Sequence, residues 1–350
     1  PTHTVNRPLT IVGGGLAGLS LGIALRNRGI PVVILEAGTY PRHRVCGEFI
    51  CGVSPLTLEK LGIAGACEAQ VTNDQSEWYY RDRSILKRRL PAPAIGISRH
   101  HQDRWLADEF VRLGGELQTN TRANPELLPS EATAWCSGRQ RRRGATLLGL
   151  KCHARGLEMA TDLQMHFGRD CYVGLSRVEG ETVNVCGLFR QRSDLETKHR
   201  HELLLAYLRA GELEKLANQL HSADLDPGSL LGVSAFQLGR QSETSNAEDG
   251  RLSLGDSYAM IPPFTGNGMT MAFQSAEIAL QPLLDYAADG PTWQETVDTI
   301  RSDLRSRFGR RLRWSMRLHP FMLKPVGQKS LAALARAHAI PFGLLFAKTR

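Results

Sequence analysis

The sequence predicts an α/β fold with a parallel sheet at the start of the chain, an inserted antiparallel β-sheet and helices at the end. Two short apolar runs, 9–12 and 32–35, flank an apolar segment of helical length. Stretches that alternate between polar and apolar residues, such as 163–167 and 182–186, follow in mid-chain. Continuous apolar runs are typical of buried parallel strands, whereas alternation is typical of antiparallel sheets. Helical spacing of apolar residues returns after residue 269.

The chain opens with a strand–helix–strand unit. The run 9–12 predicts a buried strand, and the segment 16–28, which is apolar nearly all round, predicts a helix packed on a sheet. Gly29 is a typical helix stop, and the second strand, 32–35, ends at Glu36. Two parallel strands joined by a helix are therefore the first building block of the fold.

The later elements follow from caps and periodicity. Ser54 and Pro55 are typical of an N-cap and a first helical residue, so a helix is expected to begin there. The alternation over 146–189 predicts the antiparallel sheet. Further helices are expected around 106–113, over 196–220, over 269–284 and in segments up to the C-terminus.

An insertion of one sheet type within another predicts two subdomains that share a cleft. A chain of 350 residues is also long for one hydrophobic core. We expect a discontinuous nucleotide-binding domain, a substrate domain and a C-terminal helical segment; the expected boundaries are 1–75, 96–145 and 240–300 for the first, 76–95 and 146–239 for the second, and 301–350 for the third.

Charge and cysteine usage narrow the class of protein. The net charge is +8, from 43 Lys and Arg against 35 Asp and Glu. The arginine clusters within 139–143 and 305–313 are not interleaved with aromatic residues, which argues against a nucleic-acid partner. None of the seven cysteines has CxxC spacing. This favours reduced thiols in a cytoplasmic protein, with no metal site.

A glycine-rich turn follows the first strand. Gly13, Gly15 and Gly18 form G-x-G-x-x-G at the opening of the first predicted helix. The first glycine permits a tight turn, the second lets a pyrophosphate approach the backbone, and the third lets the helix press against the strand. The N–H groups of Leu16 and Ala17 at the helix start attract phosphate. A Rossmann-like dinucleotide site is expected, and a tight turn without a ligand is the alternative.

An acidic residue completes the fingerprint. Glu36 stands 18 residues after Gly18, at the end of the second strand, with Ala37 beside it. A carboxylate in this position accepts hydrogen bonds from the adenosine ribose and repels a 2′-phosphate. The sequence therefore predicts FAD or NAD here and argues against NADP at this turn.

Two further segments carry a resemblance to a known family. Residues 99–106 read R-H-H-Q-D-R-W-L, and Gly255-Asp256 is followed by Pro263-Phe264-Thr265-Gly266-Asn267-Gly268-Met269. With the N-terminal fingerprint, and in this order, they resemble the geranylgeranyl reductase and aromatic hydroxylase superfamily of flavoproteins, which includes the group A flavin monooxygenases. The resemblance covers residues 9–285. Gln102 stands where that family usually has Phe or Leu, and 134–139 lacks the family's mid-chain Asp.

The resemblance implies a set of cofactor contacts. Asp256, after Gly255, is expected to bond the ribityl chain of FAD, and Arg99 to lie near the pyrophosphate or the flavin. A salt bridge to Asp103 is the alternative for Arg99. The late turn is expected to lie against the flavin ring, because a helix N-terminus stabilises an anion; its residues in the expected site are Pro263, Gly266, Asn267, Gly268 and Met269.

Cys46-Gly47-Glu48, which follows a loop containing Arg42, His43 and Arg44, is similar to the C-G segment of geranylgeranyl reductases, which approaches the flavin. Arg44, Cys46 and Gly47 are therefore expected near the cofactor, and Cys46 is the one candidate for a catalytic position, on the substrate side. The alternative for Cys46 is a small buried hydrophobic residue. The polar sheet residues His153, His166 and Tyr172 are expected to be hydrogen-bonded parts of the sheet.

The resemblance implies an FAD-dependent oxidoreductase, with a monooxygenase acting on an apolar or aromatic small molecule as the first hypothesis. A reductase of isoprenoid-like carbon–carbon double bonds is the alternative, and a non-catalytic nucleotide-binding module the third. In such enzymes the flavin carries the redox chemistry. No second G-x-G-x-x-G is present, so the electron donor is expected to be NAD(P)H bound transiently or a reductase protein.

The end of the chain leaves two interpretations open. The segment 314–350 is basic with apolar patches such as 341–346. It is expected either to cover the domain as a C-terminal helix or to lie on an anionic membrane as a peripheral contact. No apolar run reaches the about 18 residues of a spanning helix. The first strand begins so early that no signal peptide is expected.

Overall fold

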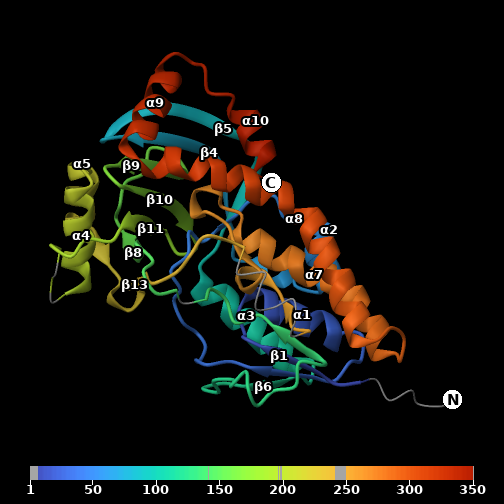
Figure 1. Ribbon diagram of the computed structural model, residues 1–350. Coiled ribbons are helices and arrows are strands. Elements are labelled where there is room, and N and C mark those ends of the chain that lie inside the picture. Colours follow the sequence, from blue (N-terminus) through green and yellow to red (C-terminus); the bar gives the residue numbers. More distant parts are fainter. Residues whose placement is uncertain (1–6, 141, 196, 198, 241–249, 350) are drawn as a thin grey trace.

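The computed structural model describes residues 7–140, 142–195, 197, 199–240 and 250–349. Arg141, in one of the two arginine clusters, lies outside the described residues, as do positions 196 and 198 in the helix expected over 196–220. Two sheets and a set of helices form the architecture in Figure 1. In Figure 1 the first sheet lies in the lower part of the view with α1 (Leu16–Arg26), α3 (Arg99–Arg112) and α7 (Gly268–Ala287), and the second sheet lies beneath the red C-terminal helices.

The first sheet is parallel throughout its described pairs and has the order β15-β7-β1-β2-β6. Its core strands are the predicted ones, and the helix between them, α1, ends at Arg26 rather than Arg28. Leu9 and Ile11 of the first predicted strand and Val32 and Ile34 of the second are buried, as is typical of parallel strands in a protein interior. The bounds are β1 (Leu9–Val12), β2 (Val32–Leu35), β6 (Glu116–Gln118), β7 (Thr133–Trp135) and β15 (Leu252–Ser253).

The second sheet has the order β12-β8-β11-β10-β9-β4-β5-β3, with β13 also paired to β8. The expected antiparallel sheet is in fact mixed, because β4 pairs parallel to β9. The chain makes a long excursion through the first sheet between these strands, and parallel pairing requires such a crossover. The bounds are β3 (Phe49–Ile50), β4 (Val71–Tyr80), β5 (Arg83–Gly96), β8 (Leu147–Arg155), β9 (Leu163–Gly168), β10 (Cys171–Val178), β11 (Thr182–Arg190), β12 (Asp224–Leu225) and β13 (Leu231–Ser234).

Two helices differ from the sequence-based expectation. The helix expected around 106–113 begins seven residues earlier, because Ser98 accepts a hydrogen bond from the N–H of His101 as N-cap. Arg99, expected just before this helix, is therefore its first residue. The helix expected over 196–220 is two helices, because Glu212 adopts a left-handed conformation between them.

The long helix α8 connects the two parts of the molecule, because it packs both on α7, beside the first sheet, and on the second sheet. The small antiparallel pair β14 (Gly239–Arg240) and β16 (Ala259–Met260) lies outside both large sheets. The bounds are α1 (Leu16–Arg26), α2 (Pro55–Leu61), α3 (Arg99–Arg112), α4 (Arg200–Ala210), α5 (Glu214–Ser222), α7 (Gly268–Ala287), α8 (Trp293–Leu323), α9 (Pro325–Arg336) and α10 (Phe342–Lys348), with short 3-10 turns at η1 (Ala64–Cys67), η2 (Pro227–Ser229), η3 (Gly255–Ser257) and η4 (Pro263–Thr265).

Candidate functional site

The glycine turn between β1 and α1 needs each of its three glycines for a different reason. Gly13 has φ +105°, and a Cβ there would lie 2.4 Å from the carbonyl oxygen of Cys136. A Cβ on Gly18 would lie 2.0 Å from the carbonyl oxygen of Gly13. At Gly15, the N-cap of α1, a Cβ would meet no atom within 4 Å. Two glycines therefore serve close packing, and the third leaves open space in front of the helix N-terminus, which fits a dinucleotide pyrophosphate.

The late motif converges on this turn from the far end of the sequence. Gly255 has φ +61°, and a Cβ there would lie 3.1 Å from Cβ of Ala17 in the first turn of α1. Its N–H donates to Ser275 Oγ of α7 at 3.0 Å. The next residue, Asp256, has its pKa raised to about 6 by burial, against the opposing effect of Arg99. Segments more than 230 positions apart thus share one site.

Three arginines and two carboxylates form a connected cluster that includes Glu36, the acid of the fingerprint. Arg99 binds Asp103 through two hydrogen bonds, of 2.7 and 2.8 Å, and Arg44 Nε lies 3.3 Å from the same carboxylate. The salt bridge considered for Arg99 is therefore present. Arg42 pairs with Glu36 at 2.5 Å. These five side chains carry a net positive charge, which favours an anionic ligand.

Glu36 is already well supplied with partners. Its carboxylate accepts hydrogen bonds from the N–H groups of Gly14 and Gly38, both at 2.8 Å, besides the Arg42 contact. Burial would raise the pKa of Glu36, but the guanidinium groups of Arg42 and Arg44 outweigh it, and the pKa lies below its ordinary value. The acid is therefore ionised and fixed at the end of β2, in the position that the fingerprint predicts.

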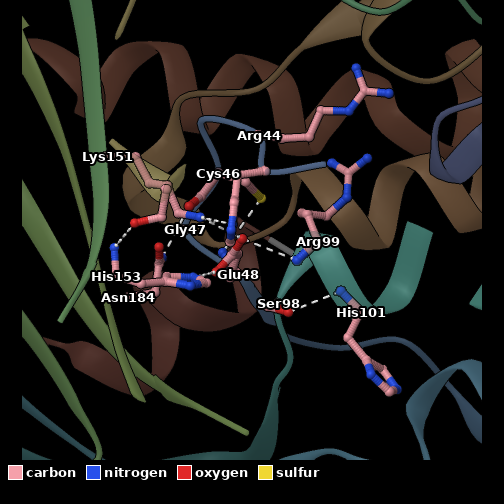
Figure 2. Close-up of polar contacts among 12 residues, drawn as sticks. Arg44, Cys46, Gly47, Glu48, Ser98, Arg99, His101, Lys151, His153 and Asn184 are labelled. Carbon is pink, nitrogen blue, oxygen red and sulfur yellow. Dashed lines mark hydrogen bonds and ion pairs between the residues drawn. The ribbon is translucent and has the colours of Figure 1, made fainter. Parts of the chain in front are cut away.

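The turn Cys46–Glu48 joins the two halves of the molecule (Figure 2). Asn184 Nδ2 of β11 donates to the carbonyl oxygen of Cys46 at 3.0 Å, and Ser176 Oγ of β10 donates to that of Gly47 at 2.8 Å. In Figure 2, Arg44 and Arg99 extend to one side of this turn, whereas Lys151 and His153 lie on the other. Burial raises the pKa of the Cys46 thiol, so the thiol is neutral near pH 7.

The late turn packs against β3. Gly266 has φ +65°, and a Cβ there would lie 2.2 Å from the ring of Phe49. Thr270 Oγ1 donates to the carbonyl oxygen of Cys51 at 2.8 Å. Asn267 Nδ2 donates at 2.9 Å to the carbonyl oxygen of Thr349, which follows α10. The turn expected to face a flavin ring is thus fixed between β3 and the end of α10.

An apolar cavity of about 110 Å³ lies between the second sheet, the late turn and the C-terminal helices. Its wall includes Gly47 and Thr265 from the two turns, and no acidic or basic side chain is among its lining residues. The sheet contributes Met165 and Phe167 to this wall. The lining residues are Gly47, Phe49, Cys51, Ser76, Trp78, Leu90, Leu163, Gln164, Met165, Phe167, Gly174, Leu175, Ser176, Phe264, Thr265, Leu318, Met322, Phe342, Leu345, Phe346 and Thr349.

The three polar sheet residues singled out from the sequence have different surroundings. His153 contacts Glu48, His166 stacks on Tyr79 with ring centroids 4.5 Å apart, and Tyr172 packs edge-on against Phe264. Burial lowers the pKa of His166 to about 3, so it is neutral near pH 7. All three are buried members of the sheet, and His153 and His166 are hydrogen-bonded as expected.

Sequence reasoning missed several residues that shape the site. Glu48, Lys151 and Asn184 carry no local motif, because their partners lie far away in the sequence. Tyr40, whose hydroxyl donates to the carbonyl oxygen of Gly14, was missed for the same reason. The sequence assigned no role to Arg42 of the loop before Cys46, although Arg42 holds Glu36. A hint was available in the positive charge of that loop, beside the predicted acid at 36.

Comparison with known proteins agrees with this geometry. A family model described as an NAD(P)-binding Rossmann-like domain matches residues 11–47. A search of curated proteins finds no match. Solved structures that resemble this one include p-nitrophenol 4-monooxygenase PnpA from Pseudomonas putida DLL-E4, with a TM-score of 0.72, 13% identity, and coverage of 97% of this chain and 95% of that chain.

Two other solved structures are also similar to this chain. A triple mutant of flavin-dependent brominase Bmp2 has a TM-score of 0.69 and 15% identity, with 97% of each chain covered. P. aeruginosa PqsL, in complex with 2-aminobenzoylacetate, has a TM-score of 0.67 and 13% identity, with 98% of each chain covered. The chain therefore has the fold of flavin-dependent monooxygenases and halogenases: a Rossmann-like domain with a parallel sheet, a mixed sheet and C-terminal helices.

Proposed function

We propose that this protein is an FAD-dependent oxidoreductase, and specifically a monooxygenase acting on an apolar or aromatic small molecule. The observation that carries the proposal is the convergence of Gly255 on Ala17, which joins the late motif to the open helix N-terminus at Gly15. The likeness in fold to a nitrophenol monooxygenase and a flavin-dependent brominase supports it. Bound FAD supplies the redox chemistry, and the protein supplies position and charge.

Five of the proposed cofactor-binding residues have definite tasks. The N–H groups of Leu16 and Ala17 bind the pyrophosphate in the space left by Gly15, and Arg44 and Arg99 add positive charge there. Asp256 accepts hydrogen bonds from the ribityl hydroxyls. The cofactor-binding residues proposed are Gly13, Gly15, Leu16, Ala17, Gly18, Glu36, Ala37, Arg44, Cys46, Gly47, Arg99, Gly255, Asp256, Pro263, Gly266, Asn267, Gly268 and Met269.

The adenosine ribose requires one rearrangement. Glu36 binds it only if Arg42, which is 27% exposed in its side chain, gives up part of its 2.5 Å contact with the carboxylate. A carboxylate offers about four acceptor sites, and Gly14 and Gly38 use two of them. Arg42 is then free to move toward the anionic pyrophosphate, where its charge remains useful.

The cavity lining defines the substrate class more closely. An engineered apolar cavity of about 150 Å³ binds benzene, so a cavity of about 110 Å³ limits the substrate to no more than about a single ring. Because no charged side chain lines it, a substrate carboxylate would be buried there without a counter-charge. The substrate proposed is therefore uncharged. Gln164 and Ser76 are the polar lining side chains on the sheet that are left to orient it.

The test begins with the visible spectrum of the purified protein and its FAD content. Gly15→Val fills the open space at the helix N-terminus and is expected to abolish FAD binding with the fold retained. Yellow colour retained by that variant would contradict the cofactor site. Oxygen uptake with NADH and with NADPH then identifies the proposed donor, and lack of uptake with either points to a reductase protein.

A substrate panel tests the monooxygenase and its specificity together. Neutral phenols and anilines are expected to stimulate NAD(P)H oxidation and oxygen uptake, whereas the same rings carrying a carboxylate are not. Stimulation by the carboxylates alone would contradict the uncharged substrate class. Anaerobic turnover of an alkene, with no oxygen uptake under any condition, would replace the monooxygenase by a carbon–carbon double-bond reductase.

A peripheral membrane contact through the C-terminal segment is proposed as a second property. None of the described helices is both long and apolar enough to cross a bilayer. Apolar side chains nevertheless stand exposed on α8, α9 and α10, among them Phe321, Val326 and Leu344, with basic neighbours such as Lys324 and Lys329. Such a surface suits an anionic membrane. We expect the unaltered protein to cosediment with anionic vesicles, and a variant carrying both Val326→Ser and Leu344→Ser to cosediment less. Equal sedimentation of the unaltered protein and this variant would exclude a membrane contact through these side chains.

A further inference from the structure

Glu48 is a fully buried carboxylate in an unusual backbone conformation. It is 0% exposed and has φ +53°, in the left-handed region that residues with a Cβ rarely adopt. Its Oε1 accepts hydrogen bonds from Lys151 Nζ at 3.0 Å and from the N–H of Arg99 at 3.0 Å, and its Oε2 lies 2.5 Å from His153 Nε2. Lys151 is itself 1% exposed. The ion pair is therefore isolated from solvent.

The neighbours of Glu48 in the chain face the other way. Gly47 and Phe49 line the apolar cavity, whereas Glu48 does not. Its side chain instead points to Lys151 and His153 of β8, as Figure 2 shows. The carboxylate thus lies behind the cavity wall, and it also binds the first N–H of α3, the helix that carries Arg99 at its start.

We propose that Glu48 is a positioning residue, whose buried bond to Lys151 and His153 fixes two things at the same time: the Cys46–Gly47 turn, of which Gly47 lines the cavity, and the start of α3. The inference deepens the proposed function and rests on it for its catalytic meaning. The geometry itself stands on contacts between β8, β10, β11 and the turn.

Backbone strain and buried charge support this role. A left-handed conformation in a residue with a side chain persists only where its surroundings impose it. Here the N–H of Ile97 donates to the carbonyl oxygen of Glu48 at 3.1 Å. The carboxylate is held at the same time by Lys151 and His153 of β8. Burial would raise the pKa of Glu48, but the His153 hydrogen bond and the Lys151 charge outweigh it, so the pKa lies below its ordinary value and the carboxylate stays ionised.

A metal site at the same place is the competing interpretation. Ligand atoms of His43, His153 and Asp226 all lie within 4.8 Å of one another. Lys151 Nζ, however, lies 3.3 Å from His43 Nδ1, and His153 Nε2 is taken up by Glu48. The ammonium group of Lys151 already lies where a metal ion would add a second positive charge. The geometry therefore favours the hydrogen-bonded cluster of Glu48, Lys151 and His153, here called the Glu48 anchor, over a metal site.

The thiol of Cys46 reports directly on the turn. Cys46 and Cys186 are partly exposed, and the other five cysteines are buried. We would measure the rate at which N-ethylmaleimide modifies Cys46, mapped by peptide mass spectrometry, in protein with and without bound FAD. Lys151→Met leaves the buried Glu48 carboxylate without its lysine cation, and Cys46 is expected to react about tenfold faster or more, because the turn opens more often.

A matched set of variants separates the anchor from general instability. Lys60→Met removes a lysine from the surface pair with Glu277, in which the lysine side chain is 52% exposed, and should leave the Cys46 rate unchanged. Lys151→Met/Glu48→Gln removes both buried charges and should return the rate toward that of the unaltered protein. Asn184→Ala, which removes only the donor to the Cys46 carbonyl, should accelerate Cys46 without unpairing a charge.

The outcomes distinguish this inference from the proposed function. If Lys151→Met and Asn184→Ala both fold and both react at the unaltered rate, the anchor does not exist. If the modification of Cys46 is faster in Lys151→Met and slows again when zinc is added, the cluster is a metal site formed by His43, His153 and Asp226 instead of the proposed anchor. In FAD-loaded protein, Lys151→Met should also change the shape of the flavin absorption band, which Lys60→Met should not. A protein that binds no FAD but shows the Cys46 response would contradict the proposed function and keep the anchor.

Discussion

Two tight turns meet at the same site, and they are held by opposite means. The turn at Gly13–Gly18 depends on the absence of side chains, because a Cβ at Gly13 or Gly18 would collide with backbone atoms. The turn at Cys46–Glu48 depends on side chains, because Glu48, Asn184 and Ser176 supply its contacts. The first turn is specified by six consecutive residues. The second is specified by residues spread over three strands and a helix.

The difference affects how each turn meets its conformational cost. Glycine adopts φ +105° at Gly13 without steric penalty. Glu48 adopts φ +53° against its preference and is held there by a buried ion pair. A buried pair adds little net stability, but breaking it leaves an uncompensated charge. The side-chain turn should therefore fail more severely when one contact is removed.

The largest effect is expected from removing the lysine of that pair. Lys151→Met should lower the free energy of unfolding by about 3–5 kcal/mol, since the Glu48 carboxylate remains buried without its cation. Urea unfolding followed by circular dichroism measures it. Lys60→Met, in an exposed pair, should cost less than about 1 kcal/mol. Equal losses in the two variants would mean that burial of the pair carries no special cost.

The same comparison explains what could be predicted from the sequence. The strands 9–12 and 32–35, the helix between them and the glycine turn were predicted correctly, because their signals lie within about 30 residues. The cap Ser54 and the following Pro55 were predicted correctly for the same reason. Local patterns carry local structure, and the dinucleotide fingerprint is a local pattern.

The mixed sheet and the Glu48 anchor could not be predicted in this way. The parallel pairing of β4 with β9 joins strands that are separated by a whole excursion through the first sheet. Lys151 sits in an alternating strand where a lysine indicates a solvent-facing position, yet it is 1% exposed. Its partner, Glu48, is 103 residues away. Only the fold brings the opposite charges together.

The glycine turn provides the next test, with two alanine substitutions three positions apart. Gly18→Ala should lower the free energy of unfolding by about 1–3 kcal/mol, because its Cβ would lie 2.0 Å from the Gly13 carbonyl oxygen. Gly15→Ala should change it by less than about 0.5 kcal/mol, because its Cβ meets nothing within 4 Å. The difference is measured on protein without added FAD. Equal destabilisation would show that Gly15 is also packed.

The smallest effect concerns His43, which connects the anchor to the surface at Asp226. Burial and the nearby Lys151 lower the pKa of His43 to about 4, from an ordinary value of 6.5. The unfolded chain therefore binds a proton that the folded chain does not, and stability is lost as the pH falls from about 6.5 to about 4. The free energy of unfolding of the unaltered protein, minus that of His43→Gln, should fall by about 1–2 kcal/mol over this window.

The control for this pH dependence is His221→Gln, at an exposed histidine on α5. It removes an imidazole from the surface of the protein and should leave the pH dependence of the unaltered protein unchanged. Urea unfolding at pH 7, 5.5 and 4 gives the free energy of unfolding of the unaltered protein, of His43→Gln and of His221→Gln at each pH. A parallel pH dependence in His43→Gln and the unaltered protein would mean that His43 is charged in the folded state. Its imidazolium would then pair with Asp226, beside Lys151, and the cluster around Glu48 would hold a second cation.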